Sequence, residues 1–169
     1  MNKLHLTQLS IARNEEVKPT SLVFTGHRVL HENFSVRRLR NAIKKQIEQG
    51  VHTFYNGMAM GFDLVSAELV LKLKEQYPHI RLIACVPCYG QEKYFTETDK
   101  KRYAEVLKNA DETIVLAPSY YRGCMQQRNR YMAERADVMI AYCNESVGGA
   151  AYTVKTFQKL KPSAEIIFI

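Results

Sequence analysis

The feature that most constrains the fold is a repeated unit: a short apolar segment, a turn rich in glycine or proline, and an amphipathic helical pattern. Six apolar segments are predicted as strands, at about residues 21–24, 52–56, 80–86, 112–117, 137–142 and 165–169. Helical patterns separate them, at about residues 33–49, from Asp63 to just before Pro78, and at about 97–110, 124–132 and 150–160. This alternation predicts an α/β protein, a Rossmann-like three-layer α/β/α fold with a mostly parallel sheet of about six strands.

The chain has 169 residues, enough for one domain with a full core and too few for two. Residues 1–19 are predicted to be an N-terminal extension, because residues 13–16 and Pro19 are typical of a linker. We assign this extension no role. Residues 20–169 are predicted to form a single domain.

Charge and hydropathy narrow the class of partner. The formal charge of +7 favours anionic partners such as nucleotides or nucleic acid. Much of this charge lies on one helical pattern without interleaved aromatic residues, which is more typical of a solvated surface than of a nucleic-acid interface. No apolar run could span a bilayer and the first residues lack a signal-peptide core, so we expect a cytoplasmic protein without membrane association and with free thiols. The basic positions of that pattern are Arg37, Arg38, Arg40, Lys44 and Lys45.

The first strand ends in Thr25, Gly26, His27 and Arg28, at the edge where open α/β sheets bind their ligands. Thr25 offers a hydroxyl, Gly26 lets the chain turn, and Arg28 can bind a phosphate with two hydrogen bonds. His27 is a candidate for binding an anion or for acid–base catalysis, although a lone histidine is more often a structural hydrogen-bonding residue.

A glycine turn follows the second strand. Gly57 and Gly61 permit a positive φ or the close approach of another group. Asp63 lies near the start of the next helix, where its carboxylate can cap free amides or accept a ligand hydroxyl. The unpaired N–H groups of a helix start suit phosphate, and the same holds for Gly148 and Gly149 before the last helix.

Further candidates lie on the remaining loops. Tyr89 and Tyr94 follow the third strand, where they would stack on a base or pack against the protein. Cys85 and Cys88 match a thiol redox motif, but Cys85 lies inside an apolar strand, so a redox function is not favoured. No Cys or His pairs complete a zinc site, and no metal is predicted. Other ligand-binding candidates are Gln91, Arg128, Asn129 and the hydroxyl of Thr153.

Four fragments carry a family resemblance: TGHR at 25–28, GMAMGFD at 57–63, RNRYM at 128–132 and GGAAYT at 148–153. In this order they resemble the YpsA-like family of the SLOG superfamily, over roughly residues 20–169. The loop PCYGQ at 87–91, which contains Gln91, is similar to a proline-to-glutamine loop of that family. The resemblance implies a Rossmann-like fold that binds nucleotides or nucleotide-derived ligands such as ADP-ribose species, with no established reaction and no required cofactor.

More distant relatives in the superfamily are the Lonely guy phosphoribohydrolases and the DNA-processing protein DprA. The hydrolases resemble this chain at Met125 and Arg128, but their glycine-rich loop is matched only at Gly148 and Gly149. The position of the hydrolase glutamate is Lys155. Ala150 departs from the pattern of the YpsA-like proteins, and Ala151 departs from the pattern of the hydrolases.

N-glycosidic cleavage requires a carboxylate that stabilises an oxocarbenium-like state or positions water. Since Lys155 replaces the glutamate, Asp63 and Glu68 are the carboxylates left as catalytic candidates, with His27 as the other candidate group.

Three functions stay open. The first is a nucleotide-binding or ADP-ribose-binding protein with a sensing or regulatory role, in which Arg28 and Arg128 bind phosphate and Asp63 binds a ribose hydroxyl. The second is a phosphoribohydrolase or another N-glycosidase. The third and least favoured is a single-stranded DNA-binding protein. The sequence leaves open the ligand, a protein partner and homo-oligomers. All three functions require the turns at Gly26, Gly57 and Gly148 to converge.

Overall fold

The computed structural model describes residues 18–169, so most of the expected N-terminal extension lies outside the described residues. The described strands are β1 (Ser21–Gly26), β2 (Thr53–Asn56), β3 (Arg81–Val86), β4 (Glu112–Val115), β5 (Val138–Tyr142) and β6 (Ile166–Phe168). The helices are α1 (Val36–Glu48), α2 (Phe62–Lys74), α3 (Glu97–Asn109), α4 (Cys124–Arg135) and α5 (Gly149–Leu160), with a short 3-10 helix, η1 (Gln91–Tyr94).

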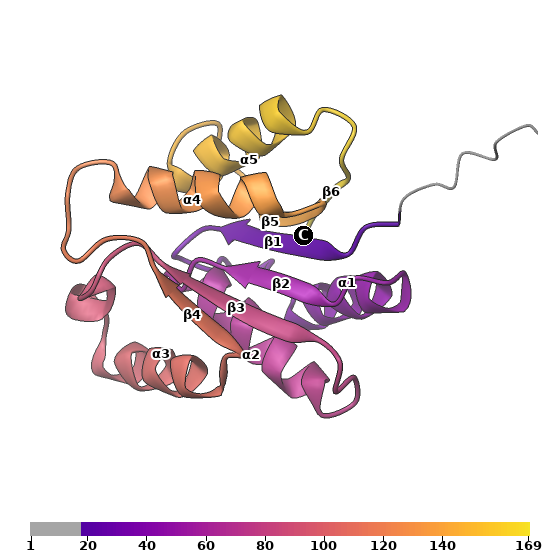
Figure 1. Cartoon of the computed structure of the whole chain (residues 1–169), viewed down its shortest axis with the longest axis horizontal. Coiled ribbons are helices and arrows are strands. Elements are labelled where there is room, and N and C mark those ends of the chain that lie inside the picture. Colours follow the sequence, from indigo (N-terminus) through magenta and orange to yellow (C-terminus); the bar gives the residue numbers. More distant parts are fainter. Residues whose placement is uncertain (1–17) are drawn as a thin grey trace, which may run out of the picture.

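The strands form one parallel sheet in the order β4-β3-β2-β1-β5-β6. Helices α1, α2 and α3 cover one face, and α4 and α5 cover the other (Figure 1). The predicted three-layer, Rossmann-like α/β fold is therefore confirmed. Each face of the sheet has its own apolar core, one that includes Leu22 and Phe24 and one that includes Val23 and Met139.

Local sequence explains why these elements form where they do. The apolar residues of β1 are fully buried on both faces, as expected of a central parallel strand. Helix α1 buries Leu39, Ile43 and Ile47 at helical spacing, and each such side chain stabilises the fold by about 1.5–3 kcal/mol. Ser35 caps its first turn, since its hydroxyl accepts a hydrogen bond from the Arg38 N–H at 3.2 Å.

The ends of two strands differ from the prediction, and the first of these lies at the site. Strand β1 continues to Gly26, because Thr25 and Gly26 still pair with Ala141 and Tyr142 of β5. Strand β4 stops at Val115, two residues earlier than expected. Pro118, which has no N–H and restricts the residue before it, follows closely and ends the extended pairing.

The order of strands reverses beside β1. From β1 the chain builds β2, β3 and β4 outward on one side, then returns to place β5 on the other side of β1. The loops after β1 and β5 therefore diverge to opposite faces of the sheet (Figure 1). Such a switch point leaves a crevice beyond the carboxyl ends of the two strands, where open α/β sheets bind ligands.

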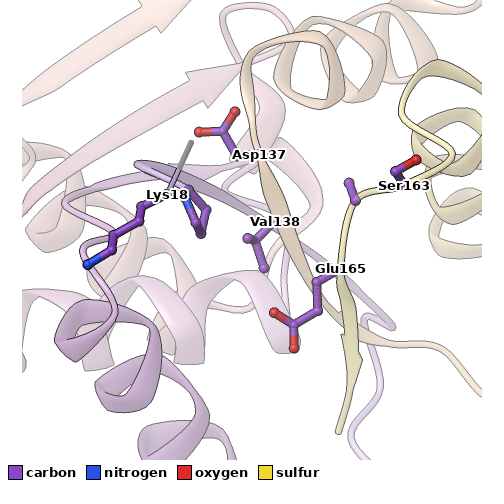
Figure 2. Close-up of a pocket in the computed structure, with 7 residues that line it drawn as sticks. Lys18, Asp137, Val138, Ser163 and Glu165 are labelled. Atoms are coloured by element: carbon purple, nitrogen blue, oxygen red, sulfur yellow. The ribbon is translucent and has the colours of Figure 1, made fainter. Parts of the chain in front are cut away.

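A separate, open pocket of about 460 Å³ lies at the opposite edge, where β5 begins and β6 approaches it (Figure 2). The carboxylate of Asp137, which lines it, accepts hydrogen bonds from the Thr20 N–H and from the Ser21 hydroxyl, both at 3.0 Å. Asp137 thus anchors the start of β1 through its Oδ2. Among the helices that the structure describes, none combines the length and apolar character needed to cross a bilayer.

Candidate functional site

A small polar cavity of about 80 Å³ opens at the carboxyl ends of β1 and β5. Residues from β1 and the loop after it, from the turn before α2, and from α2, α4 and α5 all contribute to its wall. Its lining residues are Phe24, Thr25, Gly26, Arg28, Ala59, Asp63, Met125, Arg128, Asn129, Met132, Gly149 and Ala150. The fold thus brings together seven of the residues selected from sequence: Thr25, Gly26, Arg28, Asp63, Arg128, Asn129 and Gly149.

A second cavity of about 110 Å³ adjoins the first. The two share Arg28, Ala59 and Met125, so these three residues stand between them. The second cavity is more apolar, and its other lining residues are Met60, Gln91, Tyr94 and Phe95. We call the first the polar cavity and the second the aromatic cavity.

Asp63 is the buried acid of the polar cavity, with 6% of its surface exposed. Its Oδ2 accepts a hydrogen bond from the Ala59 N–H at 3.2 Å, whereas its Oδ1 has no hydrogen-bond partner within residues 18–169. Burial raises the pKa of Asp63 to about 6, although the charge of Arg128, the Ala59 N–H and the charge of Arg28 lower it. The free Oδ1 can therefore accept a hydrogen bond from a ligand hydroxyl.

Arg128, on α4, is 4% exposed and points inward. Its Nη1 donates to the carbonyl oxygens of Gly57 and Cys85, and its Nε donates to Asn129 Oδ1 at 2.7 Å. Burial lowers the pKa of this guanidinium, while the neighbouring carboxylate of Asp63 raises it. Within residues 18–169, Arg128 and Asp63 do not form an ion pair with each other. No hydrogen bond in that part of the chain uses Arg128 Nη2. Arg128 thus ties α4 to the ends of β2 and β3 and keeps one nitrogen free.

Arg28 differs from Arg128 because it is exposed and takes part in no ion pair or side-chain hydrogen bond of the described residues. It lines both cavities. Its cation is therefore available to an anion that bridges them.

The glycines of the site divide into two groups. A Cβ on Gly26 would collide with the Phe62 ring, one on Gly61 with the carbonyl of Arg28, and one on Gly57 would lie 2.8 Å from the Arg128 guanidinium carbon. These three glycines give room to protein groups rather than to a ligand. By contrast, a Cβ on Gly148 or Gly149 would meet no atom within 4 Å, so the start of α5 is open.

The turn between β2 and α2 is held by Asn56, which sequence reasoning missed. Its fully buried amide donates to the Asp63 carbonyl at 2.8 Å, and its Oδ1 accepts from the Met58 N–H at 2.8 Å. Met58 is buried with φ of 59°, a left-handed conformation that costs a non-glycine residue about 1–2 kcal/mol. An asparagine directly before a glycine is a turn signal that could have pointed to Asn56.

Two sequence candidates face away from the polar cavity. Glu68 forms two hydrogen bonds with Arg102 of α3, from Nε at 2.7 Å and from Nη2 at 2.8 Å, and lines neither cavity. Thr153 is fully buried, and its hydroxyl donates to the Gly149 carbonyl at 2.8 Å. Both side chains stabilise the scaffold.

The remaining candidates lie around the cavities. His27 Nε2 accepts a hydrogen bond from the Asn144 N–H at 2.8 Å and so fixes the loop before α5. Gln91 donates to the Gly57 carbonyl at 2.9 Å, and its side chain borders the aromatic cavity. Tyr89 is 70% exposed and lines neither cavity, whereas Tyr94, which is 85% exposed, borders the aromatic cavity.

The parallel sheet, its switch point and the polar crevice beyond β1 and β5 define a Rossmann-like α/β protein. The family model YpsA, whose description is the YspA SLOG family, matches residues 22–168, and the chain belongs to this family. It is 29% identical over 136 residues to a UPF0398 protein of Halalkalibacterium halodurans, covering 76% of this chain and 72% of the relative. It is 27% identical over 126 residues to the UPF0398 protein YpsA of Bacillus subtilis, covering 73% of this chain and 70% of the relative.

Two solved structures share the fold. DNA processing protein A from Helicobacter pylori superposes with a TM-score of 0.65 at 18% identity, over 89% of this chain and 65% of that one. DprA from Streptococcus pneumoniae gives a TM-score of 0.64 at 13% identity, over 88% of this chain and 50% of that one. The chain therefore spans about two thirds and one half of the two solved chains.

Proposed function

We propose that this protein binds a nucleotide or a nucleotide-derived ligand of the ADP-ribose type in the two adjoining cavities, and that it acts as a sensor or regulator through a protein partner. The observation that carries the proposal is the unpartnered Oδ1 of the buried Asp63, in a cavity that the free cation Arg28 also lines. A buried acceptor of this kind calls for a donor, and a ribose hydroxyl supplies one.

The size and lining of the cavities indicate how such a ligand would lie. Neither volume reaches the roughly 300 Å³ at which pockets begin to enclose a whole small ligand. The polar cavity fits a ribose or a phosphate group, and the N–H groups of the first turn of α5, which begins at Gly149, would bind the anion. The aromatic cavity offers Tyr94 and Phe95 for stacking on a base. Arg28, between the two cavities, would bind the phosphate.

Thermal unfolding against a nucleotide library tests the proposal. AMP, NAD and ADP-ribose are compared with inorganic phosphate and with a single-stranded oligonucleotide, which tests the third hypothesis. A ligand at 100 times its Kd stabilises the protein by about 2.7 kcal/mol. Failure of every compound to raise the Tm of the native protein contradicts the proposal.

Arg28→Ala supplies the matched variant. Loss of a charge-assisted hydrogen bond of about 1.5–3 kcal/mol weakens binding by about 10- to 150-fold. Lys101→Ala removes an exposed cation of α3 that lines neither cavity, and should leave the affinity unchanged. Equal affinities of the two variants would show that Arg28 does not contact the ligand.

An N-glycosidase is the second candidate, because Asp63 places a carboxyl group of raised pKa in the polar cavity. Glu68, bound to Arg102 outside the cavity, leaves Asp63 as the carboxylate for this chemistry. Incubation of the same ligands with the protein, followed by chromatography for free base, separates the two functions. Base release that Asp63→Asn abolishes establishes the enzyme, and intact ligand together with a raised Tm establishes the binding protein.

A further inference from the structure

Helix α1 carries a concentrated positive charge that the crevice does not use. It contains five basic residues and one acidic residue, a net of +4 out of the +7 of the whole chain (24 basic minus 17 acidic residues). At about 100° per residue, the five basic side chains fall within an arc of about 160°, opposite the buried Leu39 and Ile43. The basic face of α1 consists of Arg37, Arg38, Arg40, Lys44 and Lys45.

Within the described residues, this charge is barely neutralised. In residues 18–169 the basic face takes part in one ion pair, in which Lys44 Nζ lies 4.0 Å from Glu48 Oε1. Glu48 also accepts a hydrogen bond from the Tyr77 hydroxyl at 3.3 Å. The other four basic side chains of the face are exposed and form no ion pair or side-chain hydrogen bond in the same part of the chain.

The arginines at the start of α1 are unfavourable for the stability of the helix itself. Arg37 and Arg38 lie in the first turn of α1, which contains no acidic residue. The helix dipole is positive at this end, so each cation there destabilises the helix rather than stabilising it. Proteins commonly break such a local rule at a functional surface.

The shape of the face selects among polyanions. From Arg37 to Lys45 the helix advances about 12 Å. Duplex DNA carries about one negative charge per 1.7 Å of its axis, so several phosphates lie within the length of the basic face. Helix α1 has no aromatic residue, so it offers no stacking platform for the bases of a single strand. Its apolar side is buried against the sheet except for the half-exposed Val36, so little of it can insert into a lipid surface.

We propose that the basic face of α1 binds the phosphate backbone of duplex DNA without reading its sequence. This binding is independent of the crevice, because no residue of α1 lines either cavity.

The test compares two triple variants with the same charge change. The first replaces the arginines of the basic face (Arg37→Gln, Arg38→Gln, Arg40→Gln). The control replaces exposed cations on α3 and α5 (Lys101→Gln, Lys108→Gln, Lys159→Gln). Fluorescence anisotropy with a labelled duplex, from low to physiological salt, measures the affinity. The slope of log K against log salt is expected near −4 for the native protein, about 3 smaller in magnitude for the first variant, and almost unchanged for the control.

Thermal unfolding of the same variants separates binding from structure. Removal of two cations from the first turn of α1 should raise the Tm by about 1–8 °C, while the affinity falls. An equal loss of affinity in the control variant assigns the binding to net charge and overturns the proposal. So does the absence of duplex binding at low salt, or tighter binding to single-stranded DNA, polyglutamate or anionic phosphatidylglycerol vesicles than to the duplex.

Discussion

Asp63 is buried in a setting that disfavours its charge. One carboxylate oxygen is satisfied by the Ala59 N–H, and the other is buried without a partner in residues 18–169, in a side chain that lines the polar cavity. A buried acceptor without a donor costs about 1–3 kcal/mol, so the site retains Asp63 at the expense of stability. A ligand hydroxyl that reaches Oδ1 removes this cost on binding.

The raised pKa of Asp63 predicts an unusual pH dependence. The carboxyl has a pKa of about 6 in the folded chain against 3.8 in the unfolded chain. Between these values the folded state keeps a proton that the unfolded state has lost, so the unfolding free energy falls as pH rises from about 4 to about 6. The difference of about 2 in pKa corresponds to about 3 kcal/mol.

Urea unfolding of the native protein and of Asp63→Asn at pH 4 to 8 measures this contribution. The asparagine variant lacks the titration, so its stability relative to the native protein should increase by about 3 kcal/mol between pH 4 and pH 7. Parallel stability curves for the two proteins would show that Asp63 titrates normally.

At the scale of elements, Arg128 connects helix α4 to the turn after β2 and to strand β3. It fastens α4 to the carbonyl of Gly57 after β2 and to that of Cys85 within β3. Gln91 of η1 donates to the same Gly57 carbonyl. The turn that contains Gly57 and Ala59 is thus held in place by hydrogen bonds from α4 and from η1.

Arg128→Lys is therefore expected to be strongly destabilising, although it keeps the charge. A single ammonium cannot reproduce the planar set of donors to Gly57, Cys85 and Asn129, and unsatisfied buried groups cost about 1–3 kcal/mol each. We expect a loss of about 2–4 kcal/mol in urea unfolding, with ligand binding weakened as the turn moves. Arg130→Lys, on the exposed side of the same helix, should change stability by less than about 1 kcal/mol.

The elements themselves were predictable, since each strand and helix has its own periodicity. The convergence of loops was predictable too, because parallel strands end at one edge. The roles of individual residues at that edge depended on distant partners. Arg128 turns inward toward carbonyls 71 and 43 residues away, and Glu68 meets Arg102 34 residues away. The sequence does not distinguish a glycine that leaves room for a side chain, as Gly26 does for the Phe62 ring, from a glycine that leaves room for a ligand.

At the scale of the whole molecule, the two faces of the sheet are covered unequally. The core beneath α1, α2 and α3 contains most of the large buried side chains, whereas the core beneath α4 and α5 is smaller. Local opening starts where buried apolar contacts are fewest. We therefore expect the layer of α4 and α5, which contributes Arg128 and Gly149 to the site, to be the less stable half of the fold.

Hydrogen exchange tests this inequality. Amides of α4 and α5 should exchange through openings of lower free energy than those of β1, β2 and α2. A ligand of the polar cavity should slow exchange at the first turn of α5 and around Arg128 more than elsewhere, because these residues line the cavity. Uniform exchange across both layers would contradict the assignment.

The pairing of β1 with β5 has a consequence for synthesis on the ribosome. Leu22 and Val138 are neighbours in the sheet, although more than a hundred residues of chain separate them. A nascent chain that has emerged only as far as β4 exposes one side of β1 as an unpaired edge and lacks one wall of the crevice. A ligand of the proposed site can therefore bind only after α5 has left the ribosome, and until β5 has emerged the apolar flank of β1 stays unpaired.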